Sequence, residues 1–522
     1  MRTKLTGALV AGLLAASLGT AQPSMAQEET LVLSMSYEPK FLNVNYDSDL
    51  GAPYQNMNIY SKLITYSYAN SELHGDLAES WSVSDDGLTY TFNLRQGVTW
   101  HDGAPFTSAD VVWTIEDILR EGTAAVSYKM IQDIATITAP DDHTVVITLE
   151  APNSAFLANV ASYYGFNILP KHLYEGTDVR NNPLNTAPIG TGPFKFAETV
   201  PGSHTVMLAN PDYFGEGPFV DVLIFRTIPN LATAISALEA GETAYSIASP
   251  PPGEVPRLAA SPGITVDSSN SPIVMWFGFN FDRPEFQDVR VRTAIAHAIN
   301  REEIASKLYG GLVKPADGYL TSAVGWANNP NALQPSFDPA RAEELLDEAG
   351  YPRGADGIRF RTSYTAFSFS IWGGPEQAQM IRQYLADVGI DMTVETAEFS
   401  LFNEMIRSKR DFDMVNSGGQ RGPDPSELVN FLGSKGSRNV MPWVNEEVDA
   451  LFAEDRLAVT QDQRRDIYYR IQELAAAEVP VVNLIEYAYA RPYRSEWTGW
   501  WWSDDAVGRV GQDMYNLVRR AE

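Results

Sequence analysis

Apolar and polar residues alternate along much of the first third of the chain. Residues 88–94 alternate at every position and residues 144–149 do so more loosely, which is typical of strands with one buried face. An Asp-Asp-Gly sequence at 85–87 supplies a turn before the first of these strands. Residues 30–170 are therefore predicted to be mainly strands.

After about residue 225 the pattern takes the period of amphipathic helices. Helix starts are predicted at residues that can cap a helix: Thr107 with Asp110 in a capping box, Asn230, Asp288, and Asp338 followed by Pro339. Further helical patterns occupy 375–388, 446–458 and 461–477, and β-like runs occupy 390–394 and 481–485. A strand-rich first part and an α/β second part imply at least two architectures.

The chain of 522 residues is too long for one hydrophobic core, so two or three domains are expected. Hydrophobic residues make up 44% and charged residues 20%, the balance of a soluble globular protein. The formal net charge is −28, and loss of Arg2 and Lys4 with a signal segment makes it −30. Such a charge repels nucleic acid and anionic lipid, so we expect no nucleic-acid partner and no membrane insertion.

The N-terminus has the three parts of a secretory signal peptide. Its start is positive, an apolar stretch follows from residue 5 to about 18, and Ser24-Met25-Ala26 places small residues at the cleavage positions. We expect residues 1–26 to be removed after Ala26 and the mature protein to enter the periplasm. The chain has no Cys, which excludes a lipid anchor, disulfides and thiolate chemistry.

Residue patterns give little indication of catalysis or metal binding. No Ser lies in a Gly-x-Ser-x-Gly elbow, and none of the six His residues has a second His three or four positions away. His101-Asp102-Gly103 follows a strand pattern and is interpreted as a turn. Gly190-Thr191-Gly192 lacks the third Gly and the Lys of a nucleotide loop, so it is interpreted as a tight crossing of backbones. We expect no enzyme activity, no metal and no cofactor.

Four blocks of sequence follow one another in order: 77–107, 188–196 with 210–214, 279–281 with 286–301, and 337–352. In this order and spacing the chain resembles solute-binding family 5, the peptide-, nickel- and oligosaccharide-binding receptors of bacterial ABC importers. The blocks span nearly the whole mature chain. They belong to the scaffold and do not name the ligand.

The resemblance implies an α/β fold with two lobes, the Venus-flytrap fold of periplasmic binding proteins, with an extra strand-rich domain inserted in the first lobe. The expected division is lobe I at 27–69, 195–279 and 492–522, the inserted domain at 70–194, and lobe II at 280–491. The lobes are expected to close on a ligand about a pair of crossing strands. The closed form, expected to be a monomer, would then dock on an ABC permease.

In peptide receptors of this family, a Gly-Trp pair followed shortly by an Asp holds the amino group of the peptide. The matching stretch here is 416–425, where Gly419 stands in place of the Trp. The amino-binding Asp has no clear equivalent, because Asp424 matches a later acidic residue. Arg421 instead introduces a cation with five donors, suited to a carboxylate, a phosphate or sugar hydroxyls. The alternative role for Arg421 is an ion pair with a neighbouring Asp or Glu.

Gln420 and Arg421 are the first candidates for ligand contacts in lobe II. Tyr37 and Glu38, just after the first strand, are placed to face the cleft. Aromatic residues outside helical patterns are further candidates, because aromatic faces suit peptide side chains and sugar rings alike. The candidate site comprises Tyr37, Glu38, Trp276, Tyr364, Trp372, Gly419, Gln420, Arg421 and Tyr487.

Three functions remain open on these grounds. A receptor for peptides or peptide-like solutes is the first hypothesis. The second keeps the receptor role with an oligosaccharide or an opine-type sugar conjugate as ligand, which Arg421 and Gly419 favour. A secreted hydrolase is the third, and it would require a carboxylate pair or an activated nucleophile in the cleft.

Overall fold

The structure is a computed structural model, and it describes residues 28–43, 45–46, 52–67, 72–122, 125, 127–162, 167–367, 374–504, 506, 509 and 511–521. The predicted signal peptide lies outside these residues. None of the helices in the described ranges is long and apolar enough to cross a membrane.

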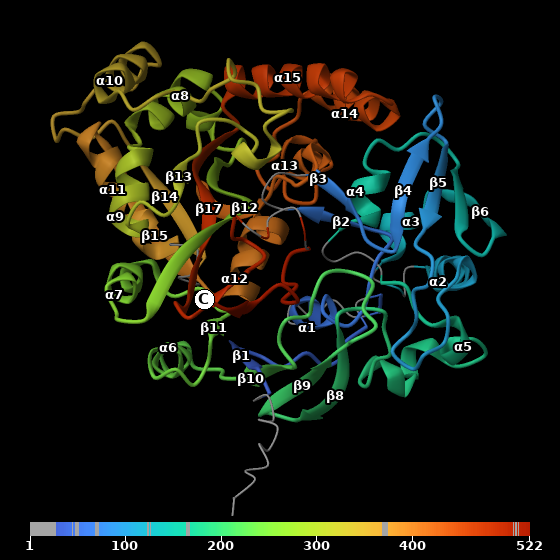
Figure 1. Ribbon diagram of the computed structural model, residues 1–522. Coiled ribbons are helices and arrows are strands. Elements are labelled where there is room, and N and C mark those ends of the chain that lie inside the picture. Colours follow the sequence, from blue (N-terminus) through green and yellow to red (C-terminus); the bar gives the residue numbers. More distant parts are fainter. Residues whose placement is uncertain are drawn as a thin grey trace, which may run out of the picture.

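One long mixed sheet runs through the molecule (Figure 1). Its strand order over the described residues is β15 (Ile390–Ala397), β14 (Phe360–Phe367), β16 (Met414–Gln420), β12 (Ile264–Phe279), β17 (Val481–Arg494), β11 (Tyr245–Ser246), β1 (Thr30–Met35), β10 (Val222–Thr227), β9 (His204–Ala209) and β8 (Phe194–Val200). The short β13 (Lys314–Pro315) pairs with β17 beside this path. Strands from both ends of the chain therefore share one sheet.

The strands β12 and β17 connect the two halves of this sheet. Each is long, and they pair antiparallel over most of their length. On one side β12 pairs with β16, and on the other side β17 reaches β11 and the β1 half. The two halves are thus joined by continuous strands, the arrangement of a hinge.

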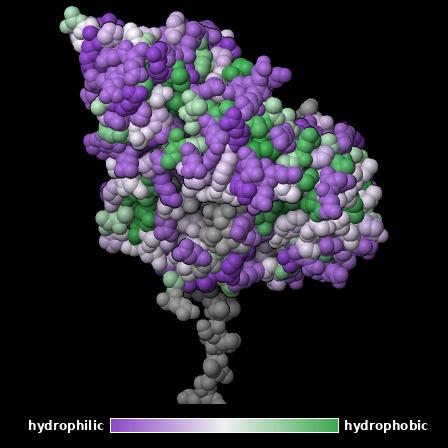
Figure 2. Space-filling view, turned by 90° about the horizontal axis from the view of Figure 1, so that it is seen from above, coloured by the Kyte–Doolittle hydropathy of each residue, from purple (hydrophilic) through white to green (hydrophobic). Residues whose placement is uncertain are grey.

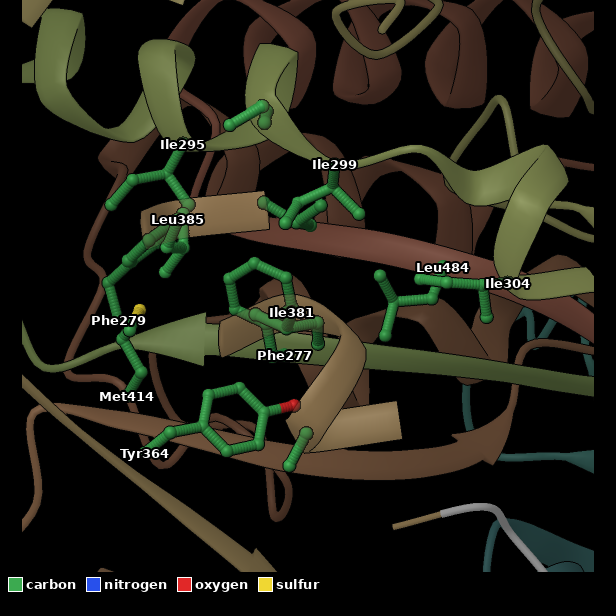
Figure 3. Packing of buried hydrophobic residues seen from close by; sticks show 14 of the residues in the cluster. Phe277, Phe279, Ile295, Ile299, Ile304, Tyr364, Ile381, Leu385, Met414 and Leu484 are labelled. Atoms are coloured by element: carbon green, nitrogen blue, oxygen red, sulfur yellow. The ribbon is translucent and has the colours of Figure 1, made fainter. Parts of the chain in front are cut away.

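Helices cover both faces of the β14–β16 half. One group packs a large core against the sheet: α8 (Val289–Ala298), α9 (Arg301–Tyr309), α10 (Pro339–Glu348) and α11 (Gly374–Asp387). In Figure 3, Ile295 of α8, Ile299 directly after it, and Ile381 and Leu385 of α11 pack over Phe277 and Phe279 of β12. The other face carries α13 (Val429–Leu432), α14 (Glu446–Leu457) and α15 (Gln461–Glu478).

The β1 half is packed by the C-terminal tail. Trp500 and Trp502 stack at 5.2 Å and both contact Tyr245 of β11. The tail ends in β19 (Arg519–Arg520), which pairs with β18 (Trp497–Thr498). The helices on this side are α6 (Leu231–Glu239) and α7 (Val255–Ala259), with α1 (Ala52–Asn56) next to the sheet.

The strand-rich insert has its own sheet in the order β4 (Ala78–Val83), β5 (Thr89–Leu94), β7 (Thr144–Leu149), β6 (Ile134–Asp141). Alternate residues of β5 and β7 are buried against α2 (Ser108–Glu121). Smaller elements complete this part: β2 (Ile64–Ser67), β3 (Glu72–Gly75), α3 (Tyr128–Ile131), α4 (Phe156–Val160) and α5 (Lys171–Tyr174). The remaining helix, α12 (Phe399–Asn403), lies beside β14.

Most local predictions are confirmed. Thr107 forms the capping box of α2, and Asn230, Asp288 and Asp338 accept backbone N–H bonds at the starts of α6, α8 and α10. The helical patterns at 375–388, 446–458 and 461–477 correspond to α11, α14 and α15 within one residue at each end. The strand predicted at 481–485 is too short, because β17 pairs with β12 and continues to Arg494.

Surface polarity agrees with the composition. Figure 2 shows one face of the molecule, on which hydrophilic residues predominate and hydrophobic residues form separate patches. The formal net charge of −28 favours solubility through repulsion between copies of the protein.

Two of the sequence motifs interlock. The backbone N–H of His101 donates to the carbonyl of Gly190 at 2.9 Å, and the N–H of Gly190 donates to Nδ1 of His101 at 3.2 Å. The other ring nitrogen, Nε2, lies 3.0 Å from the carbonyl oxygen of Gly192. Nδ1 is therefore an acceptor and Nε2 a donor, which fixes a neutral ring. The glycines serve as a close crossing of backbones, as predicted.

Protonation of His101 is expected to destabilise the fold. Burial lowers the pKa of this ring to about 4 from 6.5. Between these values the unfolded chain takes up a proton that the folded chain refuses, so stability falls as pH falls from 6.5 to 4, by up to about 3 kcal/mol. Urea unfolding at several pH values in wild type and His101→Gln measures this as the difference between two pH profiles. Parallel profiles would contradict the prediction.

Candidate ligand-binding site

The two long strands change register at two places, the first after Asn270 and the second after Met275 of β12. β12 pairs with β17 as far as Asn270 opposite Ala488 and resumes with Val274 opposite Glu486. Residues 271–273 therefore form a bulge in β12 where the sheet passes from one half to the other. Here the backbone N–H of Arg421 donates to the carbonyl of Pro272 at 2.6 Å. The end of β16 is thus fastened to the irregular part of β12.

A small pocket of about 60 Å³ lies beside this bulge. Its walls combine hydroxyl, charged and aromatic side chains: Ser268, Ser271, Leu312, Lys314, Ser322, Ala323, Glu486, Tyr487 and Ala488. The Glu486 carboxylate is held by the N–H and the hydroxyl of Ser322, at 3.0 and 2.6 Å. Tyr487, a predicted site residue, therefore lines a polar pocket at the crossing of the strands.

Aromatic residues continue along the same face of β17. Side chains two positions apart share one face of a strand, and the Tyr487 and Tyr489 rings meet edge to face at 5.1 Å. Arg491 comes next, with its guanidinium 4.8 Å from the Tyr489 ring. Its NH1 donates to the Tyr245 hydroxyl at 2.6 Å and its Nε to Ser269 Oγ at 2.8 Å. The row thus leads from one half of the sheet to the other.

The charge of Arg491 is stabilised although the side chain is buried. Burial lowers the pKa of this guanidinium, but nearby Tyr245 and Asp513 raise it more, so the net shift is upward. The arginine therefore stays protonated and orders the aromatic rings around it. Sequence reasoning missed Arg491 and Tyr245. The available signal was the alternation of Tyr487, Tyr489 and Arg491 with alanines.

Tyr54 of α1 interacts electrostatically both with this row and with one of the predicted residues after β1. Burial raises the pKa of its hydroxyl, and Asp513, Tyr489 and Tyr37 raise it further. Tyr37 itself is 46% exposed. Tyr37 and Tyr489 of the β17 row both act electrostatically on Tyr54, although the two segments are more than 400 positions apart.

Glu38 lines a larger pocket of about 310 Å³ between the segment after β1 and the β8–β9 hairpin. Its carboxylate accepts the N–H of Gly202 at 2.5 Å. Since β1 and β10 run parallel, their carboxyl ends meet at one edge of the sheet, and the residues after β1 lie there. Ligands of open α/β sheets bind outside this edge.

Arg421 is buried and lies away from both pockets. Its guanidinium stacks 4.1 Å from the Phe431 ring, and NH1 donates to the carbonyl of Tyr319 at 3.1 Å. Burial lowers the pKa of Arg421 to about 9, which leaves it charged at neutral pH. Among the described residues no carboxylate lies within ion-pair distance of it, and Asp424 pairs with Arg464 instead. The ion pair considered for Arg421 is therefore contradicted.

Other predicted residues occupy the cores. Trp276 and Tyr364 are 1% and 0% exposed, and their rings pack against Phe431 and Phe277. We therefore remove both from the candidate site. Their burial follows from positions in central strands of a sheet covered on both faces. Trp372 lies outside the described residues.

Gly419 and Gln420 lie on opposite faces of β16. A Cβ on Gly419 would come within 2.5 Å of the Phe431 ring, which explains the glycine by close packing. Gln420 is half-buried and stands opposite Ile273, next to the bulge of β12. Of these two, Gln420 has the better position for contact with a ligand.

The described residues contain no group of three or more His, Cys, Asp or Glu side chains that could hold a metal ion. The polar groups that do gather, at the bulge of β12 and after β1, are hydroxyls, a single carboxylate and a single lysine in each pocket, an amide and aromatic rings. Such groups can orient a small polar solute through hydrogen bonds and ring contacts.

Known proteins with similar sequences also indicate a protein that binds a solute. Residues 72–439 match the family described as bacterial extracellular solute-binding proteins, family 5 Middle. A Brucella ovis protein, provisionally named an ABC transporter peptide-binding protein, is 34% identical over 435 residues, or 79% of this chain and 78% of the relative. The dipeptide-binding protein of Escherichia coli is 26% identical over 95% of this chain and 96% of its own length.

A solved structure has the same fold. The ABC transporter-associated periplasmic binding protein DppA from Helicobacter pylori, in complex with the peptide STSA, is 27% identical and superimposes with a TM-score of 0.72. The match covers 95% of this chain and 99% of that protein. The chain thus has the two-lobed fold of a binding protein, and it belongs to the bacterial extracellular solute-binding proteins of family 5.

Proposed function

We propose that this protein is a periplasmic receptor that captures short peptides and delivers them to the permease of an ABC importer. It binds its ligand between two lobes and performs no chemistry on it. The observation that carries this proposal is the pair of continuous strands, β12 and β17, which join the two halves at a bulge. The ligand class comes from the relatives, one named a dipeptide-binding protein and another solved in complex with a peptide.

We propose that the lobes divide as the resemblance implies, with the crossing inside β12 and β17. Lobe I comprises 27–69, 195–279 and 492–522, lobe II comprises 280–491, and the insert is 70–194. The mature chain begins after residue 26 and acts as a monomer. Closure about the bulge is a shift of population, so a ligand must bind the closed form more tightly than the open one.

The ligand is proposed to contact Tyr37 and Glu38 from lobe I and Gln420 and Tyr487 from lobe II. Tyr54 and the β17 row are proposed to line the path from one lobe to the other. Glu38 offers a carboxylate to a peptide ammonium. Arg421 stays behind β16 and is proposed to position Gln420 rather than to touch the ligand.

Thermal unfolding tests the ligand class. A ligand present at 100 times its Kd stabilises the folded form by about 2.7 kcal/mol, so di- and tripeptides are expected to raise Tm by several degrees. Oligosaccharides and opines serve as the competing set. Peptides without effect, alongside stabilisation by sugars, would favour the oligosaccharide alternative. Hydrolysis of a bound peptide, followed by mass spectrometry, would overturn the receptor assignment.

A matched pair of variants locates the effect. Glu38→Gln can still accept the Gly202 N–H but has no charge, so it is expected to reduce the peptide-induced gain in Tm. Glu242→Gln removes an exposed carboxylate of lobe I that pairs with Arg226, and the gain should persist. Equal gains in both variants would exclude Glu38 from the site.

A further inference from the structure

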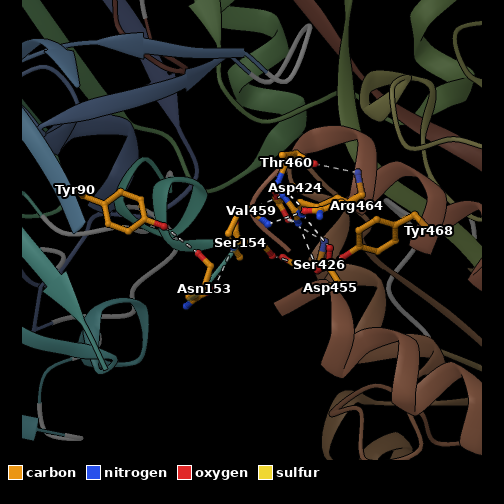
Figure 4. Close-up of polar contacts among 12 residues, drawn as sticks. Tyr90, Asn153, Ser154, Asp424, Ser426, Asp455, Val459, Thr460, Arg464 and Tyr468 are labelled. Atoms are coloured by element: carbon orange, nitrogen blue, oxygen red, sulfur yellow. Dashed lines mark hydrogen bonds and ion pairs between the residues drawn. The ribbon is translucent and has the colours of Figure 1, made fainter. Parts of the chain in front are cut away.

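The strand-rich insert touches lobe II at the corner between α14 and α15 (Figure 4). Ser154 follows β7, and its N–H donates to the carbonyl of Arg456 at 3.1 Å. Its hydroxyl lies 3.4 Å from Asp455 Oδ2, and its carbonyl accepts from Arg464 NH1 at 3.4 Å. One serine of the insert therefore meets three residues of lobe II. In Figure 1, α14 and α15 extend across the top of the molecule toward the insert.

An ion pair lies beside this serine. Arg456 NH2 is 2.8 Å from Asp133 Oδ2. The same carboxylate oxygen accepts the side-chain N–H of Asn153 at 2.8 Å, and Asn153 Oδ1 accepts the N–H of Ala155 at 3.1 Å. Asp133 is thus already oriented by its own domain before Arg456 arrives, which reduces the entropy lost when the pair forms.

An apolar contact completes the surface. Val459, in the turn between α14 and α15, is 49% exposed. A Cβ placed on Gly87 of the insert would lie 2.7 Å from its Cγ1. The glycine turn at 85–87 therefore leaves room for a valine from the other domain.

Arg464 ties this contact to the proposed ligand-binding loop. Its guanidinium donates to both oxygens of Asp424, at 2.7 and 2.9 Å, and its Nε donates to Asp455 at 2.9 Å. Asp424 lies four residues after Gln420. The arginine that meets Ser154 thus also holds the segment that leaves β16.

We infer that the contacts of Asp133, Ser154 and Gly87 with Arg456, Arg464 and Val459 form a latch that holds the two lobes closed. Arg464 couples this latch to the loop after Gln420, so seating of a ligand and docking of the insert favour each other. The latch rests on the proposed closure of the lobes. Its ion pair is partly exposed, with Arg456 at 56%, so it is weak enough to open for release.

A disulfide tests whether this contact forms in solution. The Cβ positions of Gly87 and Val459 are 3.8 Å apart, which is the usual spacing for a disulfide. The natural chain has no Cys, so Gly87→Cys with Val459→Cys can form only one intramolecular bond. Mild oxidation is expected to close it quickly. The control pair, Gly87→Cys with Leu457→Cys, should close slowly, because Leu457 lies two residues earlier in α14.

Removal of the ion pair tests the latch itself. Arg456→Ala in the first cysteine pair is expected to slow disulfide formation about threefold, the effect of one partly exposed pair. Arg470→Ala is the matched control, since this exposed arginine pairs with Glu447 and Glu473 within lobe II. Equal rates for the two cysteine pairs, or no effect of Arg456→Ala, would falsify the latch.

Two features keep the outcome interpretable. Hydrogen exchange at the Ser154 amide, measured in the cysteine-free protein, should increase by a similar factor in Arg456→Ala, and this readout does not depend on tolerance of Cys at Gly87. Both experiments are done without ligand. A protein that forms the disulfide as expected but gains no Tm from peptides would retain the latch and lose the proposed ligand.

Discussion

Replacement of Arg464 by methionine is expected to lower the free energy of unfolding by about 3–5 kcal/mol. The side chains of Asp424 and Asp455 are only 11% and 5% exposed, and both bind this guanidinium. Methionine fills a similar volume but leaves two buried carboxylates without their cation. Urea unfolding followed by tryptophan fluorescence measures the loss as a lower midpoint with an unchanged slope.

The effect of Arg464→Met should depend on pH in a defined direction. Burial raises the pKa of Asp424, but Arg464 outweighs it, so the pKa lies below its usual value. The pair therefore stabilises the wild type above pH 4, and this contribution is lost as pH falls through the lowered pKa. Without Arg464, burial is opposed only by the hydrogen bonds from Ser426, and the pKa of Asp424 is expected to rise. On acidification the variant therefore gains stability relative to wild type. The difference between their free energies of unfolding narrows toward pH 4.

A neighbouring residue provides the control. Arg465 is exposed and pairs only with Asp462 and Asp466 of its own helix among the described residues. Arg465→Met is expected to change stability by less than about 0.5 kcal/mol. A loss of under 1 kcal/mol for Arg464→Met at pH 7 would show that water reaches Asp424 and Asp455.

Local features of the fold were readable from the sequence because their causes are local. Asn230, Asp288 and Asp338 each cap a helix through a side chain that bonds a backbone N–H two or three residues on. The alternation at 144–149 puts every second residue into one core. Such signals need no knowledge of the rest of the chain.

The candidate site was harder because its geometry is set by distant pairing. Arg421 and Trp276 are residue types that often contact ligands. The register of β16 against β12 nevertheless packs both side chains against Phe431. Arg491 bonds Tyr245 across 246 positions of sequence. No local pattern states which face of a central strand meets the other lobe, so burial could not be assigned before the sheet was known.

The division into lobes shows a similar limit. Residues of β1 and β17 lie in one sheet although most of the chain separates them. The order of the domains came from the resemblance, since composition alone indicated only that two architectures were present. The length of β17 was underestimated because its second half alternates tyrosine with alanine and arginine, and β12 supplies the pairing that makes it a strand.

Gly190→Ala is expected to destabilise the protein by about 3 kcal/mol or more. A Cβ at this position would lie 1.9 Å from the carbonyl oxygen of Ile59 and 2.6 Å from its carbon. These are backbone atoms, and the same oxygen accepts the N–H of Gly192 at 2.8 Å. To relieve the clash, the backbone around Gly190 must move away from Ile59. The same backbone bonds His101. A lower urea midpoint and a lower yield of soluble protein are the expected results.

Gly253→Ala is the matched control for Gly190→Ala. A Cβ there meets no atom within 4 Å, so the substitution is expected to be neutral or to stabilise slightly by restricting the unfolded chain. A Gly190→Ala protein as stable as wild type would mean that the crossing is looser than 1.9 Å implies. If the variant is unstable but any folded fraction keeps the wild-type preference among peptides, the Gly-Thr-Gly block acts in the scaffold. Selectivity then belongs to the proposed site residues after β1 and along β17.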